Sequence, residues 1–110
     1  MPRISVIFPA YNCEKYVAAA LTSILAQEAD LEVVAVDDGS TDATGAILDN
    51  FARRDARVRV FHGENQGVAA ARNDAIARAT GEWLAFCDGD DTVPPGAYQK
   101  LLRRCARTGA

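Results

Sequence analysis

The chain has 110 residues, enough for one compact domain with a single core but not for two. Hydrophobic residues make up 49% of it and charged residues 25%, as in a packed globular protein rather than a disordered or fibrous one. Twelve Lys and Arg against fifteen Asp and Glu give a net charge of -3, so the chain lacks the positive charge expected of a nucleic-acid-binding protein.

Two sequence features bear on the cellular location. Cys13, Cys87 and Cys105 are widely spaced and form neither a zinc-binding pair nor a Cys-x-x-Cys redox pair, which favours a reduced, cytoplasmic protein. The apolar run from Val6 to Phe8 ends at Pro9, so it is far too short for a signal peptide or a membrane span. We therefore expect no direct insertion into a membrane.

The first half of the chain predicts two strands, each followed by a helix. Ile4 to Phe8 is a short, partly β-branched apolar run typical of a buried strand, and Asn12 could cap the helix after it. Apolar residues recur in four-residue steps from Glu14 to Gln27, which predicts an amphipathic helix. Leu31 to Val36 predicts the second strand, and a helix bearing Ile47 follows it.

The second half repeats the pattern. Val58 to Phe61 predicts a third strand, and an alanine-rich helix follows from Gly67 to Ala79, with Gly81 just beyond its end. Trp83 to Cys87 predicts the fourth strand. Pro94-Pro95-Gly96 then introduces a last helix, which carries the apolar residues Tyr98, Leu101 and Leu102.

Four strands alternating with four helices predict an α/β fold: a three-layer sandwich with a mostly parallel, Rossmann-like sheet covered on both faces. Ligands of such sheets bind beyond the carboxyl ends of the strands. Four polar segments fall at those ends, namely residues 9–12, 37–41, 62–66 and 88–91. We expect them to converge on one edge of the sheet.

Six of the fifteen acidic residues gather in two short stretches, and like charges this close need an offsetting cation, hydrogen-bond donor or open water. The second stretch, Asp88-Gly89-Asp90-Asp91, directly follows an apolar strand, so its carboxylates could bind Mg²⁺ or Mn²⁺ in a cleft. A solvated acidic turn is the alternative, because Asp-Gly is common in turns. A second acidic strand end in the same chain favours the metal site.

The first stretch, Asp37-Asp38-Gly39-Ser40, has two interpretations that do not exclude each other. In a loop before a helix, Gly39 would take a positive φ and Ser40 would cap the helix. One helix start needs only one cap, so two acids are more than that task requires. A carboxylate here could accept a hydrogen bond from the imide N–H of uracil or from a ribose hydroxyl.

Three further side chains near this edge each have a functional and a structural interpretation. Tyr11 could stack on a nucleobase or simply pack. Arg72 could pair with phosphate oxygens or with the acidic residues, or it could remain solvated. His62, the only histidine, is expected to satisfy a local hydrogen bond rather than to bind a metal.

Four segments resemble the successive signatures of family 2 glycosyltransferases with the GT-A fold, in the same order and at the ends of the four predicted strands. They are Ile4 to Asn12, Val36 to Asp42, Asn65 to Gly67 with Ala71 to Asn73, and Gly81 to Asp91. Each match alone would be weak, but together they cover nearly the whole chain. The resemblance implies a GT-A nucleotide-diphospho-sugar transferase fold.

The resemblance also implies a nucleotide-diphospho-sugar donor, usually a UDP-sugar. On the matching positions, Asp38 would bind the uracil, and Pro9, Ala10 and Tyr11 would form the pocket around the base. Asp90 would be the metal ligand on the diphosphate.

Further roles follow from the same resemblance. Asp88 would hold the ribose or join the metal ligands, and Arg72 would reach the phosphates. Mn²⁺ or Mg²⁺ is the implied cofactor, which would neutralise charge on the leaving diphosphate. The implied acceptor is a saccharide or a lipid-linked molecule, for a cytoplasmic enzyme of cell-envelope polysaccharide biosynthesis that could lie peripherally at the inner face of the membrane.

The chain departs from the family pattern after the acidic motif. In the family an acceptor-binding half follows and supplies the general base, commonly an Asp, whereas Thr92 to Ala110 contain no Asp, Glu or His. We therefore expect residues 1–110 to be the nucleotide-sugar-binding part of a truncated or shortened protein, without the acceptor-binding half. Such a chain could bind a nucleotide sugar without transferring it, and a bare apolar face could let it form a homo-oligomer.

Three other functions fit parts of the sequence. A haloacid-dehalogenase-like phosphatase would use Asp88 as the nucleophile of an Asp-x-Asp-x-Thr motif, although that fold carries the motif on an early strand. A dinucleotide-binding Rossmann domain would need a Gly-x-Gly-x-x-Gly turn after the first strand, which is absent. A catalytically inert nucleotide-binding or dimerisation module is the non-enzymatic alternative.

Overall fold

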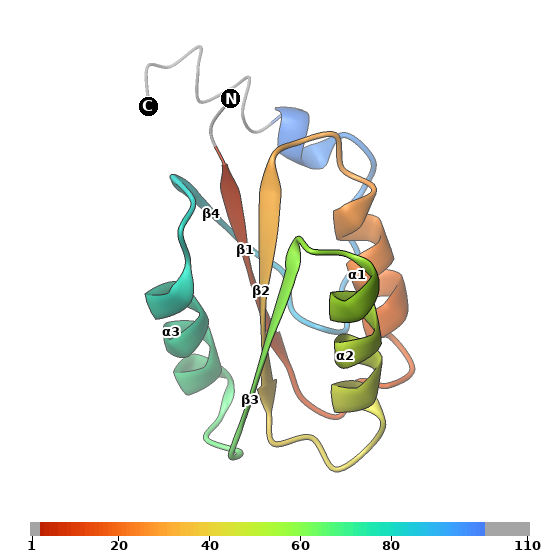
Figure 1. Ribbon diagram of the computed structural model, residues 1–110, viewed down its shortest axis with the longest axis vertical. Coiled ribbons are helices and arrows are strands. Elements are labelled where there is room, and N and C mark those ends of the chain that lie inside the picture. The colour runs from red at the N-terminus through yellow and green to blue at the C-terminus, as the bar shows by residue number, and fades with distance from the viewer. Residues whose placement is uncertain (1–2, 101–110) are drawn as a thin grey trace.

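A computed structural model describes residues 3–100, which form one four-stranded sheet with helices on both faces (Figure 1). The strands are β1 (Ile4–Ala10), β2 (Leu31–Asp38), β3 (Val58–Gly63) and β4 (Trp83–Phe86). The helices are α1 (Val17–Leu25), α2 (Thr44–Arg54) and α3 (Val68–Arg78). All neighbouring strands are parallel, in the order β3-β2-β1-β4, so the predicted parallel α/β sheet is confirmed.

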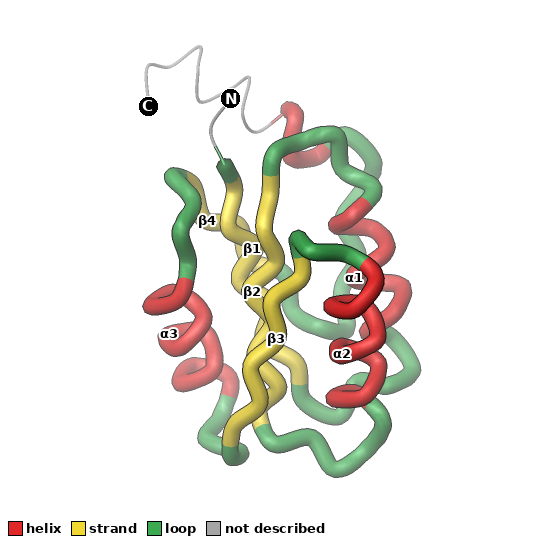
Figure 2. Tube along the Cα trace, viewed as in Figure 1, coloured by secondary structure: helices red, strands yellow, loops and turns green. Residues whose placement is uncertain are grey.

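Alternation along the strands sends side chains to opposite faces of the sheet. On β1, Val6 and Phe8 belong to the larger core cluster beneath α1 and α2, whereas Ile7 belongs to a second cluster beneath α3. Figure 2 shows α1 and α2 on one side of the sheet and α3 on the other. The predicted three-layer arrangement is therefore confirmed.

The fourth predicted helix is only partly described. A helical segment begins at residue 97, and Tyr98 on it is buried in the larger core cluster. Leu101, Leu102 and Cys105 lie outside the described residues. Within residues 3–100, no helix combines the length and the apolar character that crossing a bilayer requires.

Strand β1 continues to Ala10, so the expectation that Pro9 closes it is wrong. Proline lacks an N–H but keeps its carbonyl, and the Pro9 carbonyl accepts the N–H of Gly89 at 3.0 Å. On its other side, β1 pairs with β2 in a register that sets Ala10 opposite Asp37. The strand can therefore pass through the proline and deliver Tyr11 to the edge of the sheet.

Helix α1 begins at Val17 rather than at Glu14, and Asn12 does not cap it. The N-terminal flanking residue is Tyr16, which makes no side-chain capping hydrogen bond. Asn12 instead takes a left-handed conformation with φ 47°. Residues 12–14 therefore serve a loop contact described below and not the start of the helix.

Glu32 joins four parts of the chain near the amino-terminal edge of the sheet. Its carboxylate, 4% exposed, accepts hydrogen bonds from Ser5 Oγ at 2.6 Å and Arg59 Nη1 at 2.9 Å. It also accepts the N–H of Thr80 at 2.7 Å and the Thr80 hydroxyl at 2.9 Å. Burial raises the pKa of Glu32, but these donors outweigh burial and lower its pKa from 4.5 to about 2.

Replacing Glu32 with Gln is predicted to destabilise the fold by roughly 2 kcal/mol at pH 7, because a neutral amide cannot replace four bonds to a buried carboxylate. Since the folded-state pKa is lowered, the ionised group stabilises the fold above pH 4.5 and loses this effect as the pH falls toward about 2. Urea denaturation of wild type and Glu32→Gln should show the stability difference shrinking over that range. Glu82→Gln, at an exposed position, is the control and should match wild type at both ends.

Candidate functional site

Three loops meet at the carboxyl edge of the sheet, because β1 lies between β2 and β4. The loop after β4 is held to β1 by the N–H groups of Cys87 and Gly89, which donate to the carbonyls of Ile7 and Pro9 at 3.0 Å each. A fourth loop, after β3, reaches the same edge, because the N–H of Gln66 donates to Asp38 Oδ1 at 2.8 Å. The predicted convergence of the four segments is thus confirmed.

The first pocket at this edge encloses about 290 Å³ between the ends of β1 and β2 and the start of α3. Its lining residues are Pro9, Ala10, Tyr11, Asp38, Asn65, Gly67, Val68 and Ala71. Four of them were predicted to surround a base, namely Pro9, Ala10, Tyr11 and Asp38, and the structure brings all four together. The sequence patterns do not indicate that Asn65, Gly67 and Val68 line a pocket.

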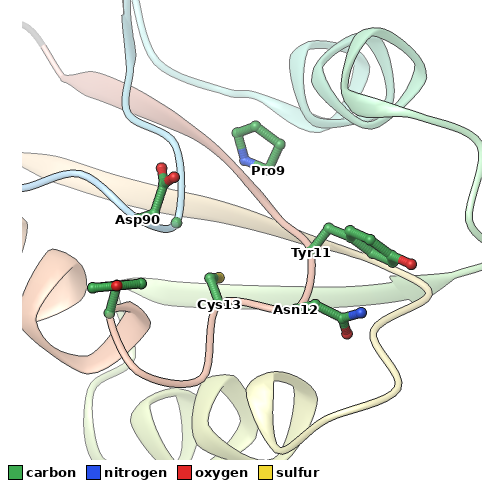
Figure 3. Close-up of a pocket in the computed structure, with 7 residues that line it drawn as sticks. Pro9, Tyr11, Asn12, Cys13 and Asp90 are labelled. Atoms are coloured by element: carbon green, nitrogen blue, oxygen red, sulfur yellow. The ribbon is translucent and has the colours of Figure 1, made fainter.

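The second pocket adjoins the first and lies toward β4 (Figure 3). Its lining residues are Pro9, Tyr11, Asn12, Cys13, Tyr16, Gly89 and Asp90. Figure 3 shows Asp90 reaching the pocket from the loop after β4, while Tyr11, Asn12 and Cys13 come from the loop after β1. Pro9 and Tyr11 line both pockets and form the wall between them. Asp38 lies in the first pocket and Asp90 in the second.

Tyr11 is not packed in the core, because its surface is 50% exposed. Half of its surface is therefore open to solvent, and the ring remains available on the wall between the two pockets. Whether it stacks on a base stays a prediction.

A set of hydrogen bonds, here termed the loop clasp, joins residues 12–14 to residues 40–44. Three consecutive N–H groups donate to side-chain oxygens: Asn12 to Ser40 at 3.1 Å, Cys13 to Thr44 at 2.9 Å and Glu14 to Asp42 at 3.2 Å. In return, Asn12 Oδ1 accepts the N–H of Thr41 at 2.8 Å, and Glu14 Oε2 accepts that of Ala43 at 3.1 Å. The Ser40 hydroxyl thus serves the clasp and does not cap α2.

Asp38 has a structural task that the sequence did not reveal. Its Oδ1 accepts the N–H of Gln66 at 2.8 Å and its Oδ2 that of Gly67 at 3.0 Å, just before α3 begins. The side chain is buried, with 6% of the residue exposed. Because each carboxylate oxygen has two lone pairs, Asp38 can still accept a further hydrogen bond from a ligand in the first pocket.

Asp37 also has structural partners, so the expectation that the two acids exceed the structural need is wrong. Its Oδ1 accepts the Ser40 N–H at 2.9 Å, and its Oδ2 lies 2.9 Å from Nδ1 of His62. Burial raises the pKa of Asp37, but the hydrogen bonds from Ser40 and His62 outweigh burial and hold it below its ordinary value. The local hydrogen-bonding role predicted for His62 is confirmed.

Arg72 pairs with Asp88, which confirms one of its predicted alternatives. Its Nη2 lies 3.0 Å and 3.2 Å from the two carboxylate oxygens of Asp88. By contrast, neither Asp90 nor Asp91 forms a side-chain hydrogen bond or ion pair with the residues the structure describes, and both are exposed. The two acids of the Asp-x-Asp motif therefore differ: Asp88 is neutralised and Asp90 is not.

The cysteines at this edge are buried thiols. Cys13 and Cys87 are both free, and burial followed by the neighbouring carboxylates raises the pKa of Cys87 to about 11. Within residues 3–100, no three His, Cys, Asp or Glu side chains cluster closely enough to hold a metal by themselves.

The fold and these pockets define a parallel α/β domain with two adjoining pockets at the carboxyl ends of its strands. The sequence model described as Glycosyl transferase family 2 matches residues 5–110. The chain belongs to this family, as the resemblance predicted. This membership does not favour the haloacid-dehalogenase-like phosphatase.

Curated relatives agree with the family assignment. The uncharacterized glycosyltransferase EpsJ of Bacillus subtilis is 41% identical over 102 residues, which are 92% of this chain and 30% of that protein. The succinoglycan biosynthesis protein ExoO of Rhizobium meliloti is 40% identical over 112 residues, which cover 100% of this chain and 32% of that protein. The chain thus spans about a third of the length of these relatives.

Solved structures share the fold. S. aureus TarS in complex with UDP superimposes with a TM-score of 0.87 at 33% identity, over 96% of this chain and 32% of that one. A mannosyltransferase from Pyrobaculum calidifontis, in complex with GDP-Man and Mn²⁺, gives a TM-score of 0.78 at 34% identity, over 84% of this chain and 29% of that one. These neighbours confirm the predicted GT-A fold.

Replacing Gly39 with Ala is predicted to destabilise the fold by about 1–3 kcal/mol. Gly39 has φ +72°, a backbone conformation that is strained for alanine. An added Cβ would also lie 2.5 Å from the backbone nitrogen of Asn65, which lines the first pocket, and would clash with it. Gly63→Ala is the matched control, because nothing lies within 4 Å of its added Cβ. Equal urea midpoints for the two variants would contradict this account of the loop.

Proposed function

We propose that this chain binds the nucleotide-sugar donor of a glycosyltransferase reaction, in which a sugar passes from a nucleotide diphosphate to an acceptor hydroxyl. The observation that carries the proposal is the pair of pockets that share Pro9 and Tyr11, with Asp38 in one and Asp90 in the other. A nucleoside beside Asp38 would direct its diphosphate toward Asp90. TarS structures with UDP and UDP-GlcNAc, which share the fold, support a nucleotide sugar as the ligand.

The first pocket suits a nucleobase. Its surface includes the exposed ring of Tyr11 and the apolar side chains of Pro9, Val68 and Ala71, against which a planar base can pack. Asp38 supplies the carboxylate acceptor that matches the imide N–H of uracil. A UDP-sugar is therefore the proposed donor.

Asp90 is the proposed metal ligand. It is the acid of the motif that faces the second pocket and has no ion-pair partner among the described residues. One carboxylate together with substrate phosphate and water is a typical environment for Mg²⁺ or Mn²⁺, so the donor set fits such a cation. A bound divalent cation would offset the negative charge that develops on the leaving diphosphate. The Mn²⁺ named with GDP-Man in the Pyrobaculum enzyme supports this proposal.

Asp88 and Arg72 are proposed to act as a pair. Because Arg72 already neutralises Asp88, this carboxylate can order the start of the acidic loop without repelling Asp90. Arg72 is 40% exposed at its side chain, so its other guanidinium N–H groups, apart from the buried Nε–H, can turn toward a phosphate. Asp88 would then hold the ribose or an outer ligand of the cation.

Residues 1–110 are proposed to be the donor-binding part of a larger catalytic unit. The chain spans about a third of the length of the curated relatives it matches, which supports this proposal. The acceptor, proposed to be a saccharide or a lipid-linked molecule, would meet groups from the acceptor-binding half. Relatives named for teichuronic acid and succinoglycan biosynthesis support a role in cell-envelope polysaccharide synthesis. We propose that this role is carried out at the cytoplasmic side.

Calorimetry of UDP binding with and without Mn²⁺ tests the proposal. We expect Mn²⁺ to strengthen UDP binding to the wild-type chain, and Asp90→Ala to weaken binding in Mn²⁺ by about tenfold or more, because the cation loses its protein ligand. Without metal, the variant and the wild type should bind UDP alike.

Asp30→Ala is the control for this experiment. It removes the same negative charge from an exposed residue that directly precedes β2, at the edge of the sheet opposite to the pockets. If Asp90→Ala and Asp30→Ala bind UDP equally in Mn²⁺, the assignment of the metal to Asp90 is wrong. If UDP binds none of the proteins under either condition, the proposed function is wrong.

A further inference from the structure

His62 bridges two carboxylates from different elements. Its Nδ1 lies 2.9 Å from Asp37 Oδ2 on β2, and its Nε2 lies 2.8 Å from Asp49 Oδ1 on α2. An ionised carboxylate only accepts hydrogen bonds, and a neutral imidazole has a single N–H to donate. Both contacts can therefore be hydrogen bonds at once only when the imidazole carries two protons and a positive charge.

A glycine on α2 leaves space for the bridge that His62 forms between the two carboxylates. Gly45 lies in the first turn of α2, and a Cβ at this position would be 2.8 Å from Asp37 Oδ2 and 3.4 Å from the His62 ring. Any side chain there would displace the pair. The absence of a side chain on α2 at this point thus lets the helix approach the bridge, which ties β2, β3 and α2 together.

The bridge is connected to the candidate nucleotide site through Asp37. The second oxygen of this carboxylate, Oδ1, accepts the N–H of Ser40, whose hydroxyl in turn accepts the N–H of Asn12 in the loop clasp. Asn12 directly follows Tyr11, and Asp37 directly precedes Asp38. The Asp37 carboxylate therefore connects His62 to the loops that carry Tyr11 and Asp38, the two side chains proposed to contact the nucleoside.

We propose that His62 is a positioning residue for nucleotide binding, whose charged ring fixes Asp37 and thereby the two loops that carry Tyr11 and Asp38. The inference rests on the proposed function, because it takes the first pocket to be the nucleoside site. Loss of the proton leaves His62 with one N–H for two carboxylates, so the hydrogen bond to Asp37 forms only part of the time and holds Asp37 less firmly. Nucleotide affinity then decreases while the pockets themselves remain.

The direction of the pH dependence follows from the same geometry. The hydrogen bond to Asp37, followed by that to Asp49, raises the pKa of His62 above its ordinary value of 6.5. Asp37 from β2 and Asp49 from α2 are the charged groups that contact the ring. Since the folded-state pKa is raised, the bridge is complete below pH 6.5 and is lost as the pH rises through the raised value.

The test is calorimetry of UDP binding at a fixed Mg²⁺ concentration between about pH 5.5 and pH 8.5. Three proteins are compared with wild type: His62→Gln, Asp49→Asn and the charge control Asp30→Asn. The phosphate of UDP titrates equally in all four experiments, so ratios of dissociation constants isolate the contribution of His62. At low pH we expect His62→Gln to bind UDP about fivefold more weakly than wild type, and this ratio should approach one at high pH.

The Asp49→Asn variant provides a measurement that distinguishes a positioning role of His62 from a purely structural one. Removal of one acceptor lowers the pKa of His62, so the midpoint of the affinity change should move to lower pH. Asp30→Asn should leave the midpoint in place. A midpoint that Asp49→Asn does not shift, or a ratio near one for His62→Gln at every pH, would overturn the inference while leaving the proposed function intact.

Two further outcomes are decisive. If wild type binds no UDP at any pH, the proposed function and this inference both fall. If His62→Gln does not fold, amide NMR of the free wild-type chain replaces it: the Ser40 N–H signal should shift with the same midpoint as the His62 ring. A Ser40 signal that is insensitive to His62 titration would overturn the inference.

Discussion

The candidate site depends on the loop clasp, the hydrogen bonds that hold the loop after β1 against the loop after β2. Parallel strands bring these loops to the same edge but leave their N–H groups without a ladder partner. In this chain the unpaired N–H groups of residues 12–14 find side-chain oxygens of residues 40–44 instead. The hydrogen bonds that satisfy the backbone are thus the same ones that place Tyr11 at the junction of the two pockets.

Neutralisation of the acidic residues bears on where the proposed cation would bind. Asp37 faces His62, Asp38 accepts two backbone N–H groups, and Asp88 pairs with Arg72. Each of these carboxylates is offset by a donor within the described chain, which removes most of the repulsion that six clustered acids would otherwise cause. Among residues 3–100, Asp90 and Asp91 have no such side-chain partner, and Asp90 lines the second pocket. Local electrostatics therefore favours a divalent cation beside Asp90 over one shared among all the acids.

The fold was predictable from the sequence, because apolar runs and four-residue periodicity are local signals that fix strands, helices and their order. Ligand-bearing loops could also be placed, since the carboxyl ends of parallel strands share an edge. Contacts between side chains far apart in the sequence could not be predicted. The bond between Asn12 and Ser40 spans 28 residues, and that between Asp37 and His62 spans 25. The start of α2 needs only one N-cap, so the sequence suggests that Asp37 and Asp38 exceed the structural need. Their hydrogen-bond partners lie on other elements, and a local pattern does not reveal them.

The spacing of the Asp-x-Asp motif has a physical reason in this fold. Gly89 is buried between the two acids, and an added Cβ would lie 2.7 Å from Cys13 Sγ and 3.1 Å from Ala10 Cβ. The backbone at Gly89 is therefore pressed against the end of β1, with its N–H bound to the Pro9 carbonyl. Asp88 on one side of this contact reaches Arg72 on α3, whereas Asp90 on the other side reaches the pocket near Cys13. A larger middle residue would lift the loop away from β1, so the small residue is what lets one carboxylate pair with Arg72 while the other lines the second pocket, where we propose that it binds the cation.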